Sequence, residues 1–160
     1  MRLEELVVTE KVWVFAIIYR YVKGRLEFLL QESQSVLPKY SGEIQMKFVG
    51  GGFEPYDENH FATLSREIES EIFLSLKLGF VPRRIHDMTH RGLRKIGFLV
   101  PLGAFVGKIR EVPLQDGTDM LLGLYWYSPE EAERKIYSTH KPLLRSAVWQ
   151  LTNNKVGPVK

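Results

Sequence analysis

Three consecutive glycines, Gly50, Gly51 and Gly52, separate a short stretch of strand-forming residues from the most regular helical pattern in the chain. The stretch before them, residues 44–49, predicts a β-strand, and the glycines predict a sharp bend or a close approach of the backbone to another group. After Asp57 or Asn59, either of which can serve as an N-cap, apolar residues recur at spacings of three and four. We therefore expect a strand, a bend and an amphipathic helix in succession. The apolar stripe of the predicted helix consists of Phe61, Leu64, Ile68 and Ile72.

Most of the remaining chain carries the signals of strands and turns. Residues 12–22 and 26–30 are rich in β-branched and aromatic side chains and are interrupted by Lys23-Gly24, which predicts a β-hairpin. Gln115, Asp116 and Gly117 predict a turn. The other expected segments are a loop at 33–42, a strand at 74–80, an irregular basic loop at 81–95 and strands at 96–106 and 120–127.

Two further helices are expected near the end of the chain. Ser128 is followed by Pro129 at a first helical position and by two acids, which predicts a helix start. Residues 142–151 carry apolar side chains on one side, and residues 152–160 are expected to form a frayed tail. With few helices interspersed among strands and no repeat, we expect one α+β domain over residues 1–160, with a curved mixed sheet covered by helices.

The composition excludes several classes of protein. The chain has no cysteine, which excludes disulfide scaffolds, cysteine-ligated zinc, iron–sulfur clusters and thiol catalysis. With 22 basic and 19 acidic residues, the net charge of +3 permits phosphate-bearing partners without implying a nucleic-acid binder. The first residues show no signal-peptide pattern, and the longest apolar stretch, 12–19, is far shorter than the roughly 20 residues that span a membrane. We therefore expect a cytoplasmic protein without a membrane segment.

The predicted helix carries two acids on one side. Glu67 and Glu71 are four residues apart, so they project about 40° apart on the helical wheel and away from the apolar stripe. Arg66 lies elsewhere on the wheel, so we expect a bound cation to compensate their repulsion. Carboxylate oxygens favour Mg²⁺ or Mn²⁺, and the glycine bend offers backbone groups for metal and phosphate contacts. For the two acids alone, a solvated helix face is the simpler interpretation.

The spacing of these residues resembles the Nudix box, which is a glycine, a glutamate and an Arg-Glu-apolar-x-Glu-Glu-x-Gly-apolar segment at fixed intervals. Serine replaces one family glutamate, and phenylalanine replaces the last family glycine. The elements expected before and after the motif agree with those of the family. The matching segment reads Gly52-x5-Glu58-x7-Arg66-Glu67-Ile68-x-Ser70-Glu71-x-Phe73-Leu74.

The resemblance implies an α/β/α sandwich and hydrolysis of a pyrophosphate bond in a nucleoside diphosphate-X substrate, with Mg²⁺ or Mn²⁺. It implies that Glu67, Glu71 and the Gly51 carbonyl hold the metal, and that Arg66 and Glu58 orient the helix face. It also implies that Glu67 or an acidic residue of a distal loop activates the attacking water. The catalytic set so implied is Glu67, Arg66 and Glu58, and the distal acids are Glu111, Asp116 and Asp119.

Three alternatives remain open from the sequence. Because Ser70 is a weak metal ligand, the chain is alternatively a non-catalytic Nudix module that binds a nucleotide, RNA or protein. His86 and His90, four residues apart, allow a zinc site, although the surrounding residues do not favour a helix. The basic residues within 83–95 allow contacts with RNA phosphates, but the absence of interleaved aromatic residues favours a solvated loop. The leaving group X and a homodimer are left open.

Overall fold

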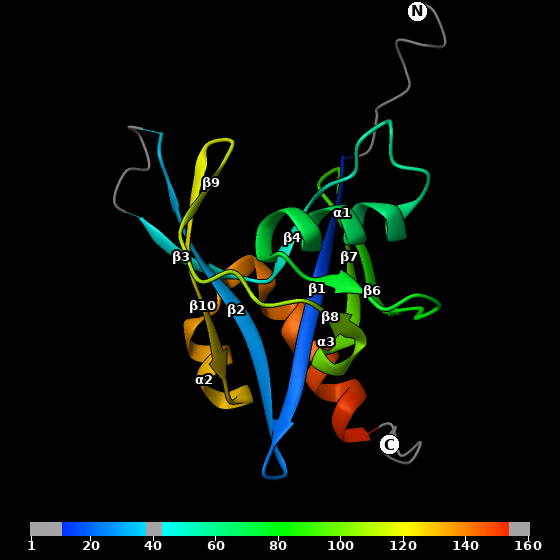
Figure 1. Cartoon of the computed structure of the whole chain (residues 1–160), viewed down its shortest axis with the longest axis vertical. Coiled ribbons are helices and arrows are strands. Elements are labelled where there is room, and N and C mark those ends of the chain that lie inside the picture. Colours follow the sequence, from blue (N-terminus) through cyan, green and yellow to red (C-terminus); the bar gives the residue numbers. More distant parts are fainter. Residues whose placement is uncertain (1–10, 38–42, 154–160) are drawn as a thin grey trace, which may run out of the picture.

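The computed structural model describes residues 11–37 and 43–153. Within these ranges the strands form an eight-stranded mixed sheet with the order β6-β7-β1-β2-β10-β9, to which β3 adds on β2 and β4 adds on β1 (Figure 1). Strands β5 and β8 form a separate pair. The strands are β1 (Lys11–Val22), β2 (Arg25–Ser35), β3 (Ile44–Lys47), β4 (Val49–Gly52), β5 (Ser75–Leu76), β6 (Arg83–His90), β7 (Leu93–Pro101), β8 (Phe105–Val106), β9 (Leu114–Asp116) and β10 (Asp119–Tyr127), and the helices are α1 (His60–Ile72), α2 (Pro129–Lys135) and α3 (Lys141–Asn153).

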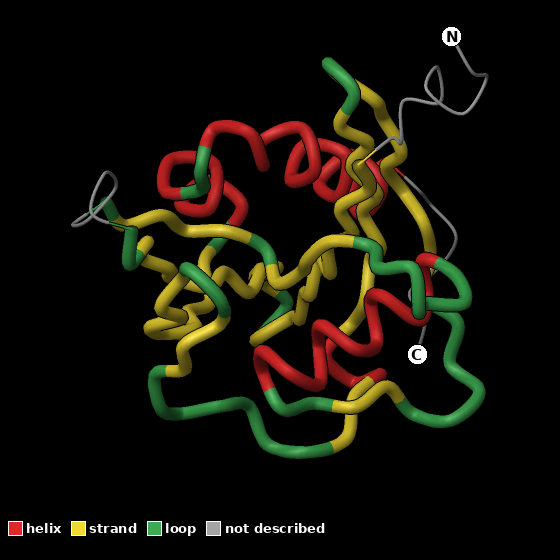
Figure 2. Tube along the Cα trace, turned by 90° about the horizontal axis from the view of Figure 1, so that it is seen from above, coloured by secondary structure: helices red, strands yellow, loops and turns green. Residues whose placement is uncertain are grey.

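Helices cover both faces of the sheet, as Figure 2 shows. The residues in the middle of the central strand β1 are all apolar, so both faces of this strand can be buried. Its residues Val14 and Ala16 pack with α1, whereas Phe15 and Ile17 pack with α2 and α3. The expected α+β class and α/β/α sandwich around a curved mixed sheet are confirmed. No helix in the described part of the chain is long and apolar enough to cross a membrane.

Two hairpins use the same turn chemistry. Lys23 and Gly24 both have positive φ angles, 51° and 78°, as a two-residue type I′ turn requires, which confirms the first predicted hairpin. Arg91 and Gly92 repeat this conformation at 51° and 76° and join β6 to β7. The expected irregular loop at 81–95 is therefore wrong. Its polar residues form an edge strand that is largely exposed, so the segment lacks the apolar alternation that identifies a strand in a sequence.

The three glycines lie inside a strand rather than at a bend. Strand β4 pairs antiparallel with β1, with Gly50, Gly51 and Gly52 opposite Phe15, Val14 and Trp13. The expected close approach is present, because a β-carbon at Gly51 would overlap the Glu67 carboxylate and one at Gly50 would overlap the Val14 carbonyl. The expected sharp bend at the glycines is wrong. The predicted strand 44–49 is in fact two strands, β3 and β4, separated by Phe48.

Other boundaries differ from the expectations in length. The predicted strand at 74–80 contains only β5, and β2 extends into the predicted loop at 33–42, whose residues 38–42 lie outside the described residues. The two later helices start near their predicted positions, and Ser128 caps α2 by accepting a hydrogen bond from the Glu131 N–H. Helix α3 continues to Asn153, so the expected tail at 152–160 begins later, and residues 154–160 lie outside the described residues.

Phe73 ends α1 in a left-handed conformation, with φ 65° and ψ 21°. A phenylalanine in place of the glycine of the box would be expected to make the chain leave the helix by a different route, but Phe73 adopts the backbone conformation that glycine favours at a helix end. Gly107 lies against it, since a β-carbon there would be 3.1 Å from the Phe73 carbonyl oxygen.

The left-handed backbone conformation of Phe73 predicts a difference in stability between two substitutions at this position. We expect Phe73→Gly to be more stable than Phe73→Ala by about 1 kcal/mol, because alanine retains the left-handed penalty and both variants lose the same half-exposed ring. Urea unfolding of the two variants measures the difference. Equal stability would show that the conformation at residue 73 is unstrained.

Candidate metal site

Three carboxylates from two elements meet at one end of α1. Glu67 and Glu71 come from α1 and Asp116 comes from β9, and one oxygen of each lies within 4.8 Å of the others. Glu67 is 8% exposed and Glu71 is 4% exposed, whereas Asp116 is exposed. The interpretation of Glu67 and Glu71 as a solvated helix face is therefore wrong. Buried like charges at this separation favour a bound cation, and three oxygen donors suit a hard divalent ion.

The pKa values of the two buried acids reflect this crowding. Burial raises the pKa of Glu71 well above its ordinary value, and the neighbouring Glu67 charge raises it further. Burial also raises the pKa of Glu67, with a further increase from Asp116 and an opposing effect from Arg66. Without a metal, the carboxyl groups of Glu67 and Glu71 thus stay protonated to a higher pH than ordinary glutamic acid side chains do. A cation that binds here competes with protons, so its affinity rises with pH.

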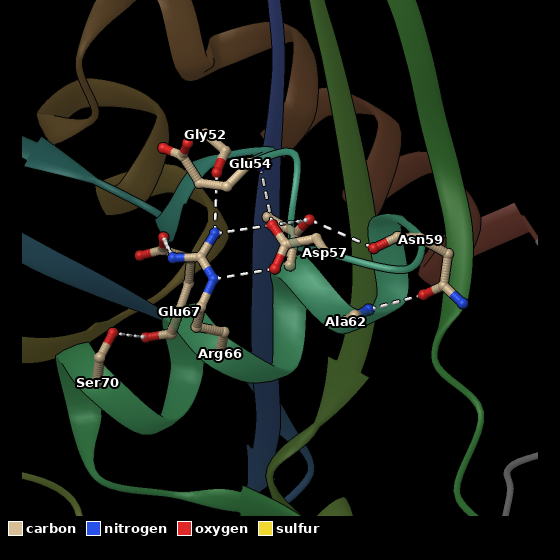
Figure 3. A network of polar contacts seen from close by, with 9 residues as sticks. Gly52, Glu54, Asp57, Asn59, Ala62, Arg66, Glu67 and Ser70 are labelled. Atoms are coloured by element: carbon tan, nitrogen blue, oxygen red, sulfur yellow. Dashed lines mark hydrogen bonds and ion pairs between the residues drawn. The ribbon is translucent and has the colours of Figure 1, made fainter.

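Arg66 fixes the position of Glu67, as Figure 3 shows. Its guanidinium donates from Nη1 to Glu67 Oε1 at 2.7 Å, and from Nε and Nη2 to the two oxygens of Asp57 at 3.1 and 2.9 Å. Nη2 also donates to the Gly52 carbonyl at 3.0 Å. The wheel argument that separated Arg66 from the acids is therefore wrong for Glu67, because the long arginine side chain reaches its neighbour in sequence.

Asp57 takes the orienting role that we expected of Glu58. Asp57 is buried and also accepts hydrogen bonds from the Glu54 N–H and the Thr63 hydroxyl, while Asn59 provides the N-cap. Glu58 is exposed and lines a separate cavity of about 520 Å³. The carboxylate that holds Arg66 is thus one residue earlier in the chain than the box spacing implied.

Asp57 gives a pH-dependent prediction. Hydrogen bonding to Arg66 lowers the pKa of Asp57 to about 2, so its contribution to stability is complete above its ordinary pKa and is lost as the pH falls toward 2. We expect Asp57→Asn to lower the free energy of unfolding at pH 7 by about 2 kcal/mol. Urea unfolding between pH 7 and pH 2 should show this difference shrinking below about pH 4. A difference that stays constant to pH 2 would contradict the assigned charge state.

Backbone groups of β4 complete one side of the cluster. The Gly50 N–H donates to Glu71 Oε2 at 3.3 Å, and Gly51 leaves the space that the Glu67 carboxylate occupies. The register of β4 turns the Gly51 carbonyl toward β1, since the Phe53 N–H, two residues on, donates to the Val12 carbonyl. One lone pair of the Gly51 carbonyl is thus engaged in the sheet, and its role as a metal ligand stays a prediction.

The three acids line a cavity of about 400 Å³. The cavity continues past the edge of β4 that Gly50, Gly51 and Gly52 form, which we call the glycine edge. Its walls include the three acids and the glycines, together with aromatic and basic side chains. These other lining residues include Trp13, Phe15, Lys47, Lys95, Tyr137 and His140.

Comparison with solved structures decides the fold. A MutT Nudix hydrolase from Burkholderia pseudomallei superposes with a TM-score of 0.60 at 18% identity, over 85% of this chain and 96% of that one. An Ap4A hydrolase from C. elegans gives 0.60 at 19% identity, over 89% and 98% of the two chains. The Nudix domain of Shewanella oneidensis NrtR, complexed with ADP ribose, gives 0.63 at 15% identity, over 95% and 100%. The chain has the Nudix fold. No family model matches the sequence, and a search of curated proteins finds no match either.

Within this Nudix fold, Ser70, one of the two positions that depart from the box, lies outside the acid cluster. Ser70 is exposed, and its hydroxyl donates to the Glu67 carbonyl at 3.3 Å. Asp116 supplies a third carboxylate from a distant element instead. Of the other distal candidates, Asp119 lines the same cavity, whereas Glu111 lines a different one and pairs with Lys108.

The sequence did not indicate the buried network behind Glu71. Arg110 is 5% exposed, and its Nε donates to the Glu71 carbonyl at 2.7 Å. Its Nη2 donates to Gln31 Oε1 at 2.9 Å, and Gln31 Nε2 donates to Glu71 Oε1 at 3.1 Å. Neither residue belongs to a local motif, since Gln31 lies in β2 and Arg110 precedes β9. Only the tertiary pairing of these segments brings them to this end of α1.

The alternative zinc site does not form. His86 and His90 lie on β6, and the His86 Nδ1 is 3.0 Å from the Ser146 hydroxyl. Among the described residues, the acid cluster is the group of three potential metal ligands that come together, and neither histidine belongs to it. The spacing of four residues places a histidine pair on one face of a helix, and this segment is a strand.

Proposed function

We propose that this chain hydrolyses a pyrophosphate bond in a nucleoside diphosphate-X substrate and uses Mg²⁺ or Mn²⁺. The observation that carries the proposal is the convergence of the Glu67, Glu71 and Asp116 carboxylates at one cavity, with Glu67 and Glu71 buried. The Nudix fold and the hydrolases that share it support the reaction class. Oxygen ligands and the absence of thiols support the choice of metal.

Each residue of the site has a distinct task in this proposal. Glu67, Glu71 and Asp116 would hold the divalent ion, which when bound neutralises phosphoryl charge and makes a water more acidic. Arg66 holds Glu67 in one orientation. Gln31 and the Gly50 N–H do the same for Glu71. Asp116 makes no ion pair among the described residues and is exposed at the cavity, so its carboxylate is free to bring a third oxygen to the ion from β9.

A metal-dependent assay tests the proposal. Purified protein is incubated with a panel of nucleoside diphosphate derivatives and dinucleoside polyphosphates, with Mg²⁺, with Mn²⁺ or with a chelator, and the nucleotide products are separated. We expect turnover of at least one substrate with a divalent ion and none with the chelator. Folded protein that hydrolyses no panel member with either ion would refute the proposal.

A second candidate function follows from Ser70. The structure has three clustered carboxylates but lacks the glutamate of the box at residue 70, so the chain is alternatively a module that binds a nucleotide, RNA or protein without turnover. The cytoplasmic location, the homodimer that the sequence left open and the expectation that nucleic acid is not a partner stay predictions.

Ser70→Glu separates the two candidates. If the wild type is an enzyme, we expect this added carboxylate to change turnover less than about tenfold, because Asp116 already supplies a third acid. If the wild type is a binding module, the variant gains metal affinity and acquires turnover that the wild type lacks. Activity with Mg²⁺ and Mn²⁺, and metal affinity by calorimetry, are measured on both proteins, with Ser65→Glu on the same helix as the control.

A further inference from the structure

His140 is a buried imidazole that the proposed hydrolysis does not use. It ends a short 3₁₀ helix, Ser138–His140, and is 4% exposed. Its ring contacts Phe15 edge-on, with centroids 4.6 Å apart, and lies nearly parallel to Phe48 at 6.1 Å. These two aromatic neighbours hold the ring in one orientation at the wall of the cavity.

The hydrogen bonding of His140 fixes which nitrogen carries the proton. The Phe48 N–H donates to His140 Nδ1 at 3.3 Å, so Nδ1 is the acceptor and is unprotonated. Burial, together with the charges of Lys95 and Lys47, lowers the pKa of His140 to about 3. The ring is therefore neutral at physiological pH, and its proton is on Nε2. Within the described residues, this Nε2–H has no hydrogen-bond partner, although it belongs to a side chain that lines the cavity.

The surroundings of His140 favour a particular kind of ligand. Lys47 and Lys95 both line the cavity, both act electrostatically on His140, and both are donors only, and Lys95 Nζ already donates to the Thr139 carbonyl at 3.2 Å. Trp13 is 42% exposed and lies nearly parallel to the Phe15 ring, with an interplanar angle of 17°, so it offers a flat apolar surface. Hydrogen-bond donors next to an aromatic surface suit a planar ring that carries acceptor atoms.

The glycine edge of β4 connects this end of the cavity with the acid cluster. Gly51 faces Glu67 on the α1 side, whereas Trp13 and Phe15 lie on the opposite face of the sheet with α3. A β-carbon at Gly52 would meet little, its nearest neighbour being the Val12 carbonyl oxygen at 4.0 Å. One ligand can therefore extend past the edge of the sheet and reach both ends.

We propose that the His140 end of this cavity binds a heterocyclic base with an oxo group at position 6 of a purine or position 4 of a pyrimidine, and that the Nε2–H of His140 donates a hydrogen bond to that oxygen. The proposal rests on the proposed function, because the acids at the other end would hold the diphosphate of the same substrate. Hypoxanthine, guanine and uracil present such an oxygen. Adenine presents an amino group at the corresponding position, and cytosine does so at its position 4, so either base would place a donor against the Nε2–H donor.

The test measures binding without a metal, so it does not depend on turnover. Protein labelled with ¹⁵N is titrated with inosine 5′-monophosphate, adenosine 5′-monophosphate, uridine 5′-monophosphate, cytidine 5′-monophosphate and inorganic phosphate, while long-range ¹H–¹⁵N spectra follow the His140 ring. We expect His140 to be the neutral Nε2–H tautomer in the free protein. We expect inosine and uridine monophosphates to bind at least about tenfold more tightly than their amino-bearing counterparts and to shift the Nε2 signal.

His140→Phe provides the matched variant, because it keeps a ring between Phe15 and Phe48 and removes the donor. It should bind the members of each pair equally. If the variant does not fold, the comparison of ligands on the wild type decides the matter alone. Equal affinities, an Nδ1–H tautomer, no binding at millimolar concentration, or a shift produced by inorganic phosphate alone would each overturn the inference. Hydrolysis with equal affinities would leave the proposed function intact, and a base preference without hydrolysis would refute only the proposed function.

Discussion

Replacing Glu71 with glutamine is expected to lower the rate of metal-dependent hydrolysis by about 10³-fold or more, since the metal supplies several kcal/mol of charge stabilisation to the reaction. Glu71 is the most buried acid of the cluster, and both of its oxygens accept hydrogen bonds, one from Gln31 and one from the Gly50 N–H. Glutamine fills the same volume but removes the negative charge. Its amide NH₂ would also face either the Gln31 amide or the Gly50 N–H, which are themselves hydrogen-bond donors. The variant should therefore fold without binding the ion.

Two measurements distinguish this loss from general damage. For the wild type, Mg²⁺ or Mn²⁺ should raise the melting temperature, because a ligand that binds only the folded state stabilises it. For Glu71→Gln, that increase should vanish, while the melting temperature without metal stays close to that of the wild type, since the substitution also removes the repulsion with Glu67. Glu69→Gln, an exposed position on the same helix, serves as the control and should retain both activity and the metal-induced increase. A Glu71→Gln variant with more than about a tenth of wild-type activity would contradict the assignment of Glu71 to the metal.

Arg110→Lys is expected to lower the free energy of unfolding by about 3 kcal/mol, which is the largest stability effect we expect from a single conservative change. The guanidinium donates to the Gln31 side chain and to four backbone carbonyls, and a lysine cannot reach them all because its donors lie on one atom. The carbonyls left behind are buried or partly buried, so they lose their partners without gaining water. They belong to Glu71, Val112, Leu121 and Leu122.

The control for this prediction makes the same substitution at the surface. Arg145→Lys alters an exposed ion pair with Glu133, in which the arginine side chain is 66% exposed, and it should change stability by less than about 1 kcal/mol. Urea unfolding at pH 7 measures both variants. An Arg110→Lys variant within about 0.5 kcal/mol of the wild type would show that the network around Gln31 and Glu71 is not a structural support.

The parts of the site that the sequence predicted correctly are those set by local geometry. Glu67 and Glu71 are four residues apart on one helix, so helical periodicity alone brings them together. Asp116 could not be distinguished from Glu111 and Asp119, because its position depends on the pairing of β9 with β10 and of β10 with β2. The sequence alone does not show which of the acidic residues in this segment the strand pairing places next to a distant helix.

The incorrect expectations have a common origin in tertiary context. Gly50 and Gly52 favour a bend locally, but pairing with β1 keeps them extended. Strand β6 has the composition of a solvated loop, and it is stable as a strand because β7 offers it a partner along almost its whole length. Phe73 adopts the conformation of the glycine it replaces because the chain must turn there toward β5. The buried Arg110 carries no local signal at all.

The position of a bound ion tests the central claim most directly. Crystals grown with Mn²⁺ and a non-hydrolysable diphosphate analogue give an anomalous difference map that locates manganese without reference to any assumed ligand. The account predicts one or more peaks coordinated by Glu67 and Glu71 with Asp116 beside them, and the diphosphate bound against the ion. Manganese bound elsewhere, or an analogue seated in the cavity with no ion at the three acids, would contradict it.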